Sequence, residues 1–348
     1  MASEAGTSDG RAAGETGTSG GLADGVVGAS ERNRARVRAW AELLRLPALF
    51  TVPGDALAGA AALTARPDHR TLLAIGSSLC LYEAGMVLND WADRAEDAVE
   101  RPHRPLPSGR VSPTAAFTAA CAFTAAGLAL ATRAGRPALT VAAPLAATVW
   151  SYDLALKHTP AGPFAMAAAR CLDLLLGAAA TAGRARPALP SAALLATHTL
   201  AVTTLSRQET REGTPTAALA ALATTGALTW LLQRRPTPGL PTKRRSPDGQ
   251  LHGHHGRSGP GPGSPHPLPA PLTAALAATY ATTTARSYLH ASLNPSPPLT
   301  QQAVGAGIRG TIPLQAALIA RSGATATALL TAALAPVARR LARRVSIT

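Results

Sequence analysis

The sequence predicts an all-α fold, a polytopic bundle of about nine transmembrane helices. Of its 348 residues, 47% are hydrophobic and only 15% are charged, whereas about 25% of the residues of a typical soluble domain are charged. Long segments rich in alanine, leucine and threonine recur along the chain, and about twenty apolar residues are enough for a helix to cross a bilayer. Aromatic residues make up 3% of the chain, and the abundant alanine indicates helices that approach one another closely through small side chains.

The first 37 residues differ from the rest in composition. Residues 1–37 are rich in glycine, alanine, serine and threonine and contain no apolar run, which predicts a disordered N-terminal tail. They also lack the basic stretch followed by an apolar stretch that marks a secretory signal. The basic segment 31–38 directly precedes the first apolar span. It favours a cytoplasmic N-terminus for a membrane domain that we expect at 38–348.

Nine apolar segments are expected to cross the membrane as helices. They lie at 40–64, 71–92, 113–133, 137–156, 161–183, 188–206, 215–233, 269–291 and 299–321. A tenth segment, 324–338, is shorter and ends in an arginine cluster, so a tenth crossing stays open. The stretch 234–268 is rich in proline and glycine, which predicts a disordered linker. With the N-terminus inside, the loops 93–112, 157–160 and 207–214 would all be cytoplasmic.

The net charge of +14 at neutral pH needs an explanation of its own. In a soluble protein, such a charge would favour nucleic-acid binding. Here the basic residues lie mainly between apolar segments and at the C-terminus, where membrane topology and phosphate binding account for them better. We therefore expect the lipid bilayer and a phosphorylated ligand as partners, and no nucleic acid.

A group of acidic residues follows directly on the second apolar segment. Because an α-helix repeats every 3.6 residues, Asp90, Asp93 and Asp97 fall on one face, and Glu83 extends this stripe backwards. Carboxylates stacked in this way repel one another unless a cation lies among them. Oxygen-rich sites suit Mg²⁺, which is commonly shared with substrate phosphates. The pattern predicts a Mg²⁺–diphosphate site at the mouth of a membrane helix; the alternative is an ordinary acidic helix end.

Four segments together resemble the UbiA-type intramembrane prenyltransferases. Residues 89–97 read N-D-W-A-D-R-A-E-D and match the family's first acidic signature, N-D-x-x-D-x-x-x-D. Residues 101–109 read R-P-H-R-P-L-P-S-G and are similar to the segment that follows this signature in the family. Residues 152–157 resemble its Y-x-x-x-x-K motif, and residues 170–177 stand where R-x-x-N-x-x-x-G is common. The resemblance covers about residues 40–340.

The chain departs from the family between the sixth and seventh helices, where a second acidic run, D-x-x-x-D, is typical. Glu209 and Glu212 are three residues apart rather than four, and Arg207 and Arg211 add positive charge. Glutamate can ligate Mg²⁺ as aspartate does, and the planar guanidinium of arginine suits a diphosphate. This pattern and the run at 308–316 resemble the EboC-like branch of the family.

The resemblance implies a helical bundle around a central cavity, in the cell membrane and with its site on the cytoplasmic side. The implied reaction is Mg²⁺-dependent transfer of a prenyl group from an isoprenoid diphosphate to an aromatic or other small hydrophobic acceptor. The implied metal ligands are Asp90, Asp93, Asp97, Glu209 and Glu212. The three aspartates and Lys157 are the implied catalytic residues. The implied substrate-binding residues are Asn89, Arg104, Lys157, Asp173, Arg207, Glu209, Arg211 and Glu212.

Two other functions stay open. The altered second run is consistent with a scaffold that binds a prenyl diphosphate without turning it over. The intramembrane acids are also consistent with a multi-pass transporter. Transporters commonly show internal repeats, and no repeat is evident here, while the acids cluster at a helix end beside basic residues. Phosphate binding therefore explains them better than an ion pathway does.

Overall fold

The computed structural model describes residues 31, 33–209, 214–234 and 269–345. Most of the expected N-terminal tail and nearly all of the expected linker at 234–268 fall outside these residues. The end of the expected tail, 33–37, is described and belongs to a helix that continues to residue 43.

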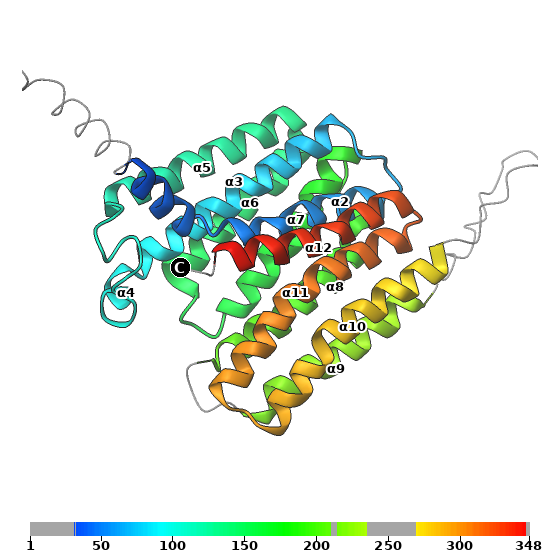
Figure 1. Cartoon of the computed structure of the whole chain (residues 1–348). Coiled ribbons are helices and arrows are strands. Elements are labelled where there is room, and N and C mark those ends of the chain that lie inside the picture. Colours follow the sequence, from blue (N-terminus) through cyan, green and yellow to red (C-terminus); the bar gives the residue numbers. More distant parts are fainter. Residues whose placement is uncertain (1–30, 32, 210–213, 235–268, 346–348) are drawn as a thin grey trace, which may run out of the picture.

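The described residues form helices and contain no strand (Figure 1). The α-helices are α2 (Val52–Ala62), α3 (His69–Ala92), α4 (Arg94–Glu100), α5 (Pro113–Ala134), α6 (Arg136–Ser151), α7 (Gly162–Ala182), α8 (Leu189–Ser206), α9 (Pro215–Gln233), α10 (Pro269–Leu293), α11 (Pro297–Arg321) and α12 (Thr325–Val345). Two short 3₁₀ helices, η1 (Leu46–Thr51) and η3 (Arg186–Ala188), and a π-helical turn, η2 (Tyr152–Leu156), complete the set.

Local sequence signals account for several helix starts. Asp68 precedes α3 and accepts a hydrogen bond from the Thr71 backbone N–H at 3.0 Å, while the Thr71 hydroxyl accepts one from the Asp68 N–H at 2.9 Å. Ser112 caps α5 by accepting a hydrogen bond from the Ala115 N–H at 3.2 Å. These bonds satisfy N–H groups that the first turn of a helix leaves without partners.

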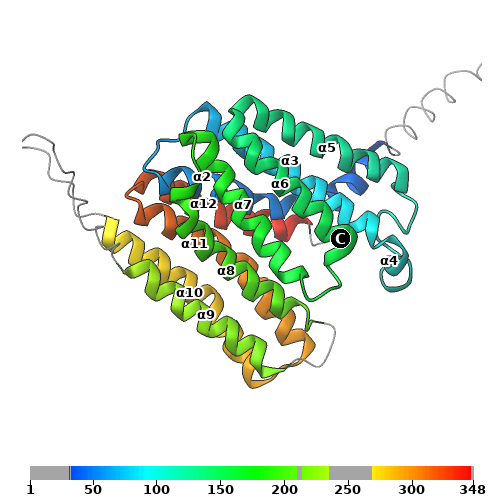
Figure 2. The ribbon, with the colours of Figure 1, turned by 180° about the vertical axis from the view of Figure 1, so that it is seen from behind.

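The helices pack as one bundle in which α2 and α7 are central. Helices α3, α5 and α6 pack on one side of α7, and α8 packs against its other side. Beyond α8, the helices α9, α10 and α11 lie side by side (Figure 2). Helix α12 packs against α11 and η1. The arrangement confirms the predicted all-α bundle.

Fewer helices than the nine expected from the sequence are long and apolar enough to cross a membrane. Among the described residues, seven helices are long and apolar enough to cross a membrane: α3, α5, α6 with its continuation η2, α7, η3 with α8, α9 and α11. The first expected span, 40–64, is broken, because Arg45 has a left-handed backbone (φ 43°) and Pro47 begins a new helix there. Helix α10 contains Arg286 and His290 and is not among the seven. The predicted count of nine is therefore approximate.

Two glycines bring α2 and α7 into backbone contact. A Cβ placed on Gly59 would lie 2.0 Å from the carbonyl oxygen of Leu174. A Cβ placed on Gly177 would lie 2.3 Å from the carbonyl oxygen of Ala56. Small residues permit this approach between membrane helices. The contact fixes α7, which carries two polar residues of the site, against α2.

We expect Gly177→Ala to destabilise the protein by about 1–3 kcal/mol, because the new methyl group must displace the backbone of α2. The measurement is the midpoint of unfolding in detergent. Gly226→Ala in α9 is the matched control, since a Cβ at this position meets no atom within 4 Å and alanine favours helix. Equal unfolding midpoints for the two variants would contradict the close contact.

Candidate functional site

The acidic signature lies where α3 ends and α4 begins. Asp90 and Asp97 are buried, and Asp93 forms the junction between the two helices. Arg104 joins the two buried carboxylates: its Nη1 lies 2.8 Å from Asp97 Oδ2 and 3.6 Å from Asp90 Oδ1. The structure therefore places four of the predicted site residues, the three aspartates and Arg104, in one cluster.

Each aspartate of this cluster is paired with a protein cation. Arg45 Nη2 donates to Asp90 Oδ1 at 2.7 Å. Arg101 Nη1 lies 3.3 Å from Asp97 Oδ1, and Lys157 Nζ donates to Asp93. Sequence reasoning missed Arg45, which is distant in the chain. The available signal was a lone arginine before a proline inside an apolar span.

The π-helical turn η2 brings a second set of polar side chains to this cluster. Its wide turn is closed by a hydrogen bond from the Lys157 N–H to the Tyr152 carbonyl at 2.9 Å. Such turns are frequent at functional sites. Asn89 Nδ2 donates to Asp153 Oδ1 at 3.1 Å. Asp153 was also missed, although a carboxylate within a membrane span is itself a sign of function.

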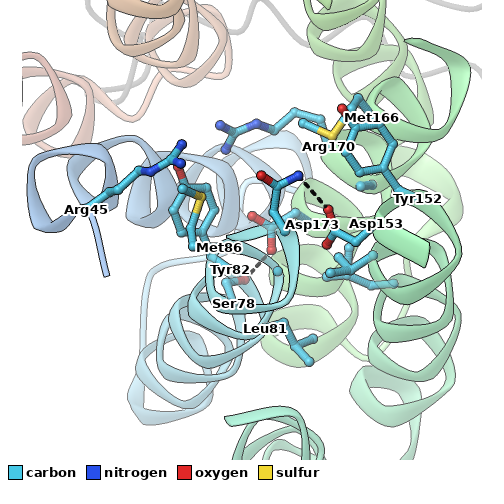
Figure 3. A pocket seen from close by; sticks show the side chains of 15 residues that line it. Arg45, Ser78, Leu81, Tyr82, Met86, Tyr152, Asp153, Met166, Arg170 and Asp173 are labelled. Carbon is cyan, nitrogen blue, oxygen red and sulfur yellow. Dashed lines mark hydrogen bonds between the residues drawn. The ribbon is translucent and has the colours of Figure 1, made fainter. Parts of the chain in front are cut away.

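A cavity of about 320 Å³ opens beside the cluster (Figure 3). Its apolar lining residues are Leu81, Gly85, Met86, Leu145, Val149, Met166 and Ala169. Its polar lining residues are Arg45, Ser78, Tyr82, Asn89, Tyr152, Asp153, Arg170 and Asp173. Asp173, a predicted substrate-binding residue, is buried and accepts a hydrogen bond from Ser78. Arg45, which pairs with Asp90, and Asn89, which precedes Asp90 in the chain, both line the cavity. The cavity and the acidic cluster therefore form one continuous site.

One wall of the cavity rests on a buried polar network. Arg170 Nη1 donates to Asp55 Oδ2 at 2.5 Å. Gln315 Nε2 donates to Asp55 Oδ1 at 2.6 Å and to the Thr51 carbonyl at 2.7 Å. These bonds connect η1, α2, α7 and α11. The network holds Arg170 at the cavity while compensating its charge, as a buried guanidinium requires.

The loop between α8 and α9 also approaches the cluster. Arg207 donates a hydrogen bond to the Thr159 carbonyl, close to Lys157 in the chain. Burial raises the pKa of the Glu209 carboxyl, and the charge of Arg101 partly opposes this shift. Arg211 and Glu212 lie in 210–213, outside the described residues. Of the four predicted residues of this loop, Arg207 and Glu209 are described, and both lie on the side of the acidic cluster.

A further group of potential metal ligands borders the cluster. One ligand atom from each of Asp93, Glu96 and His158 lies within 4.8 Å of the others. Glu96 and His158 are exposed, and Asp93 is partly buried. Carboxylate oxygens are the donors that Mg²⁺ prefers, so the donor set of the whole cluster fits this ion.

A comparison with protein-family models identifies the family. The model of the UbiA prenyltransferase family matches residues 48–233, which is more than half of the chain. The chain belongs to the UbiA prenyltransferase family. It is therefore a multi-pass membrane protein, as the seven apolar helices found among the described residues also indicate. The matches do not separate out an EboC-like branch, which stays a prediction.

Curated relatives match shorter segments. The chain is 38% identical over 129 residues to digeranylgeranylglyceryl phosphate synthase of Methanopyrus kandleri, covering 36% of this chain and 46% of that protein. It is 33% identical over 148 residues to the synthase of the same name of Ignicoccus hospitalis, covering 42% and 48%. The matched segments thus span about half the length of these relatives.

Solved structures match over most of the bundle. A structure concerned with digeranylgeranylglyceryl phosphate synthase in membranes has a TM-score of 0.55 at 17% identity, covering 82% of this chain and 98% of that one. A UbiA homologue of Archaeoglobus fulgidus bound to GPP and Mg²⁺ has a TM-score of 0.51 at 16% identity, covering 82% and 99%. At such identities the matches show the fold, and they confirm the UbiA-like bundle.

Proposed function

We propose that the protein transfers a prenyl group from an isoprenoid diphosphate to a small acceptor within the membrane, in a Mg²⁺-dependent reaction. The observation that carries this proposal is the joining of three aspartates and four cations, Arg45, Arg101, Arg104 and Lys157, to a largely apolar cavity. One end suits a metal and a diphosphate, and the other suits a hydrocarbon chain. The basic residues before the first span support a cytoplasmic position for this end of the site.

At the charged end, Asp90, Asp93 and Asp97 would hold Mg²⁺. When bound, the ion supplies positive charge to the oxygens of the leaving diphosphate. In the structure, Arg104 donates to Asp97 and Lys157 donates to Asp93. A diphosphate bound beside these aspartates would offer both cations further hydrogen-bond acceptors. These cations stabilise the negative charge that develops as the diphosphate leaves. Arg207 and Glu209 would complete this end from the α8–α9 loop.

At the apolar end, the cavity would hold the first part of the isoprenoid chain. Loss of diphosphate leaves an allylic cation, which water would quench. Side chains such as Leu81, Leu145 and Val149 line the cavity and exclude water from the reacting carbon. The polar residues opposite, including Asp173, would contact the acceptor.

The relatives support a hydroxyl-bearing acceptor more than an aromatic one. Those described above are named for the synthesis of a glyceryl phosphate. The aromatic acceptor expected from the resemblance has no support from these names. We therefore propose a small hydrophobic acceptor that presents a hydroxyl group to the cavity.

The decisive experiment incubates the purified full-length protein with Mg²⁺, prenyl diphosphates of several chain lengths and a panel of acceptors. Pyrophosphate release that depends on both the acceptor and Mg²⁺, and stops with a chelator, is expected. Tight diphosphate binding without release for every acceptor would instead support the scaffold function that the altered second acidic run suggests. Transport of a solute with no diphosphate binding would support a transporter.

We expect Lys157→Ala to weaken the binding of geranyl diphosphate about 10-fold to 100-fold, which is the loss of one charge-assisted hydrogen bond. Acceptor affinity should change little. Equilibrium binding of labelled geranyl diphosphate in the presence of Mg²⁺ measures the effect. Arg94→Ala is the control, because the Arg94 guanidinium stacks on Trp91 and donates to its carbonyl. Within the described part of the chain, it makes no ion pair with the acidic cluster. Unchanged diphosphate affinity in Lys157→Ala would remove Lys157 from the site.

A further inference from the structure

Asp153 is a buried carboxylate with an incomplete set of partners. It is 4% exposed and lines the cavity. Its Oδ1 accepts the hydrogen bond from Asn89, and among the described residues no other group hydrogen-bonds to it. Gly85 faces the second oxygen: a Cβ built at Gly85 would lie 3.7 Å from Asp153 Oδ2 and 2.9 Å from Val149. The missing side chain at position 85 leaves Oδ2 accessible from the cavity.

The position of Asp153 relates the two ends of the site. Asn89, which holds Oδ1, is the chain neighbour of Asp90 in the acidic cluster. Lys157, one turn later on the same segment, is not part of the cavity lining and donates to Asp93. The π-helical turn presents the Asp153 carboxylate to the cavity (Figure 3). Lys157, which directly follows this turn, is paired with the acidic cluster. Asp153 therefore lies between the acidic cluster and the apolar part of the cavity.

The carboxylates of the polar network and of the acidic cluster are held by cations. Asp55 is held by Arg170 and Gln315, and each aspartate of the acidic cluster is paired with an arginine or lysine. Asp173, which also lines the cavity, accepts a hydrogen bond from Ser78 and lies one helix turn from Arg170 on α7. Asp153 makes no ion pair among the residues that the structure describes, and its one partner is a neutral amide. A proton can therefore be added to Asp153 without leaving a neighbouring cation unpaired.

We infer that Asp153 is the base that removes the proton from the acceptor's hydroxyl group. The inference rests on the proposed function. The acceptor's O–H bond breaks, and its proton moves to Asp153 Oδ2. The acceptor oxygen forms a bond with C1 of the prenyl chain, while the bond between C1 and the diphosphate oxygen breaks and its electron pair leaves with the diphosphate. Proton transfer to a correctly placed base accelerates such reactions by about 100-fold to 10,000-fold.

The test compares Asp153→Asn with the wild type, using geranyl diphosphate and Mg²⁺ with two acceptors at pH 7.5. Octylglycerol carries protonated hydroxyl groups, whereas 4-nitrophenol is largely ionised and needs no base. Pyrophosphate release with octylglycerol should fall about 100-fold or more, whereas release with 4-nitrophenol should fall less than about 3-fold, because only the first reaction uses the base. Asparagine can still accept the hydrogen bond from Asn89, so binding of geranyl diphosphate should be unchanged. Thr148→Ala is the control and should match the wild type with both acceptors, because Thr148 is a half-buried residue of α6 outside the cavity lining, whose hydroxyl donates to the Pro144 carbonyl.

The outcomes separate the two proposals. An equal loss with both acceptors means that Asp153 only positions Asn89, and it overturns the inference. Full activity of Asp153→Asn with octylglycerol, or a wild type that uses only 4-nitrophenol, overturns it as well while leaving the proposed function in place. A wild type that releases no pyrophosphate with any acceptor of the panel removes the proposed function and this inference with it.

Discussion

Asp90→Asn is expected to lower the rate of pyrophosphate release by about 100-fold or more, the loss seen when one stabilising contact to a leaving oxygen is removed. Asp90 is buried at the end of α3 and lies within 3.6 Å of Arg104 and 2.7 Å of Arg45. The substitution keeps the shape of the side chain but removes the negative charge that a Mg²⁺ ligand needs. Release of pyrophosphate at saturating Mg²⁺ and geranyl diphosphate measures the effect.

A control is needed because Asp90 also neutralises protein cations. In Asp90→Asn, Arg104 keeps its ion pair with Asp97 at 2.8 Å, so the cluster should retain its fold. Glu100→Gln in α4 removes a negative charge from the same region. The Glu100 side chain is 52% exposed, and its one ion pair among the described residues is with Arg101 at 3.8 Å. This variant should keep activity within about 2-fold, because an exposed ion pair contributes little. Activity of Asp90→Asn equal to that of Glu100→Gln would rule out Asp90 as a metal ligand.

The acidic cluster could be predicted because its information is local. The signature lies within one segment of nine residues, and helical periodicity alone brings Asp90, Asp93 and Asp97 together. The structure adds a change of helix at Asp93, yet Arg104 still joins Asp90 and Asp97. The neighbouring motif that contains Arg104 was recognisable for the same reason.

The partners of these aspartates could not be predicted in the same way. Arg45 meets Asp90 across 45 positions of the chain, and Asn89 meets Asp153 across 64. Such pairs depend on how the helices pack against one another, and a short sequence motif contains no information about this packing. The break at Arg45 needed a left-handed backbone before Pro47, and the orientation of Asp153 needed a π-helical turn. Both are irregularities that a search for uninterrupted apolar spans passes over.

Asp55→Ala is expected to destabilise the protein by about 3–5 kcal/mol, because removing one partner of a buried ion pair leaves the other charge uncompensated. Asp55 is fully buried, and Arg170 and Gln315 both donate to it. Among the described residues, Arg170 would keep its hydrogen bond to the Thr51 hydroxyl at 3.3 Å and the nearby charge of Asp173, and it would lose its ion pair. The free energy of unfolding in mixed detergent micelles measures this cost.

The double variant Asp55→Ala, Arg170→Leu decides whether the cost arises from the unpaired charge. If it does, removing Arg170 as well should restore about half or more of the lost stability, since apolar replacements of buried ion pairs are often tolerated. The coupling free energy between the two sites should then reach about 1–3 kcal/mol. Additive losses would show that Asp55 acts through Gln315 and the packing of α2 against α11 instead. In that case, Arg170 would keep its position in the cavity lining without Asp55. Asp55→Ala should then leave diphosphate binding intact at temperatures where the protein is folded.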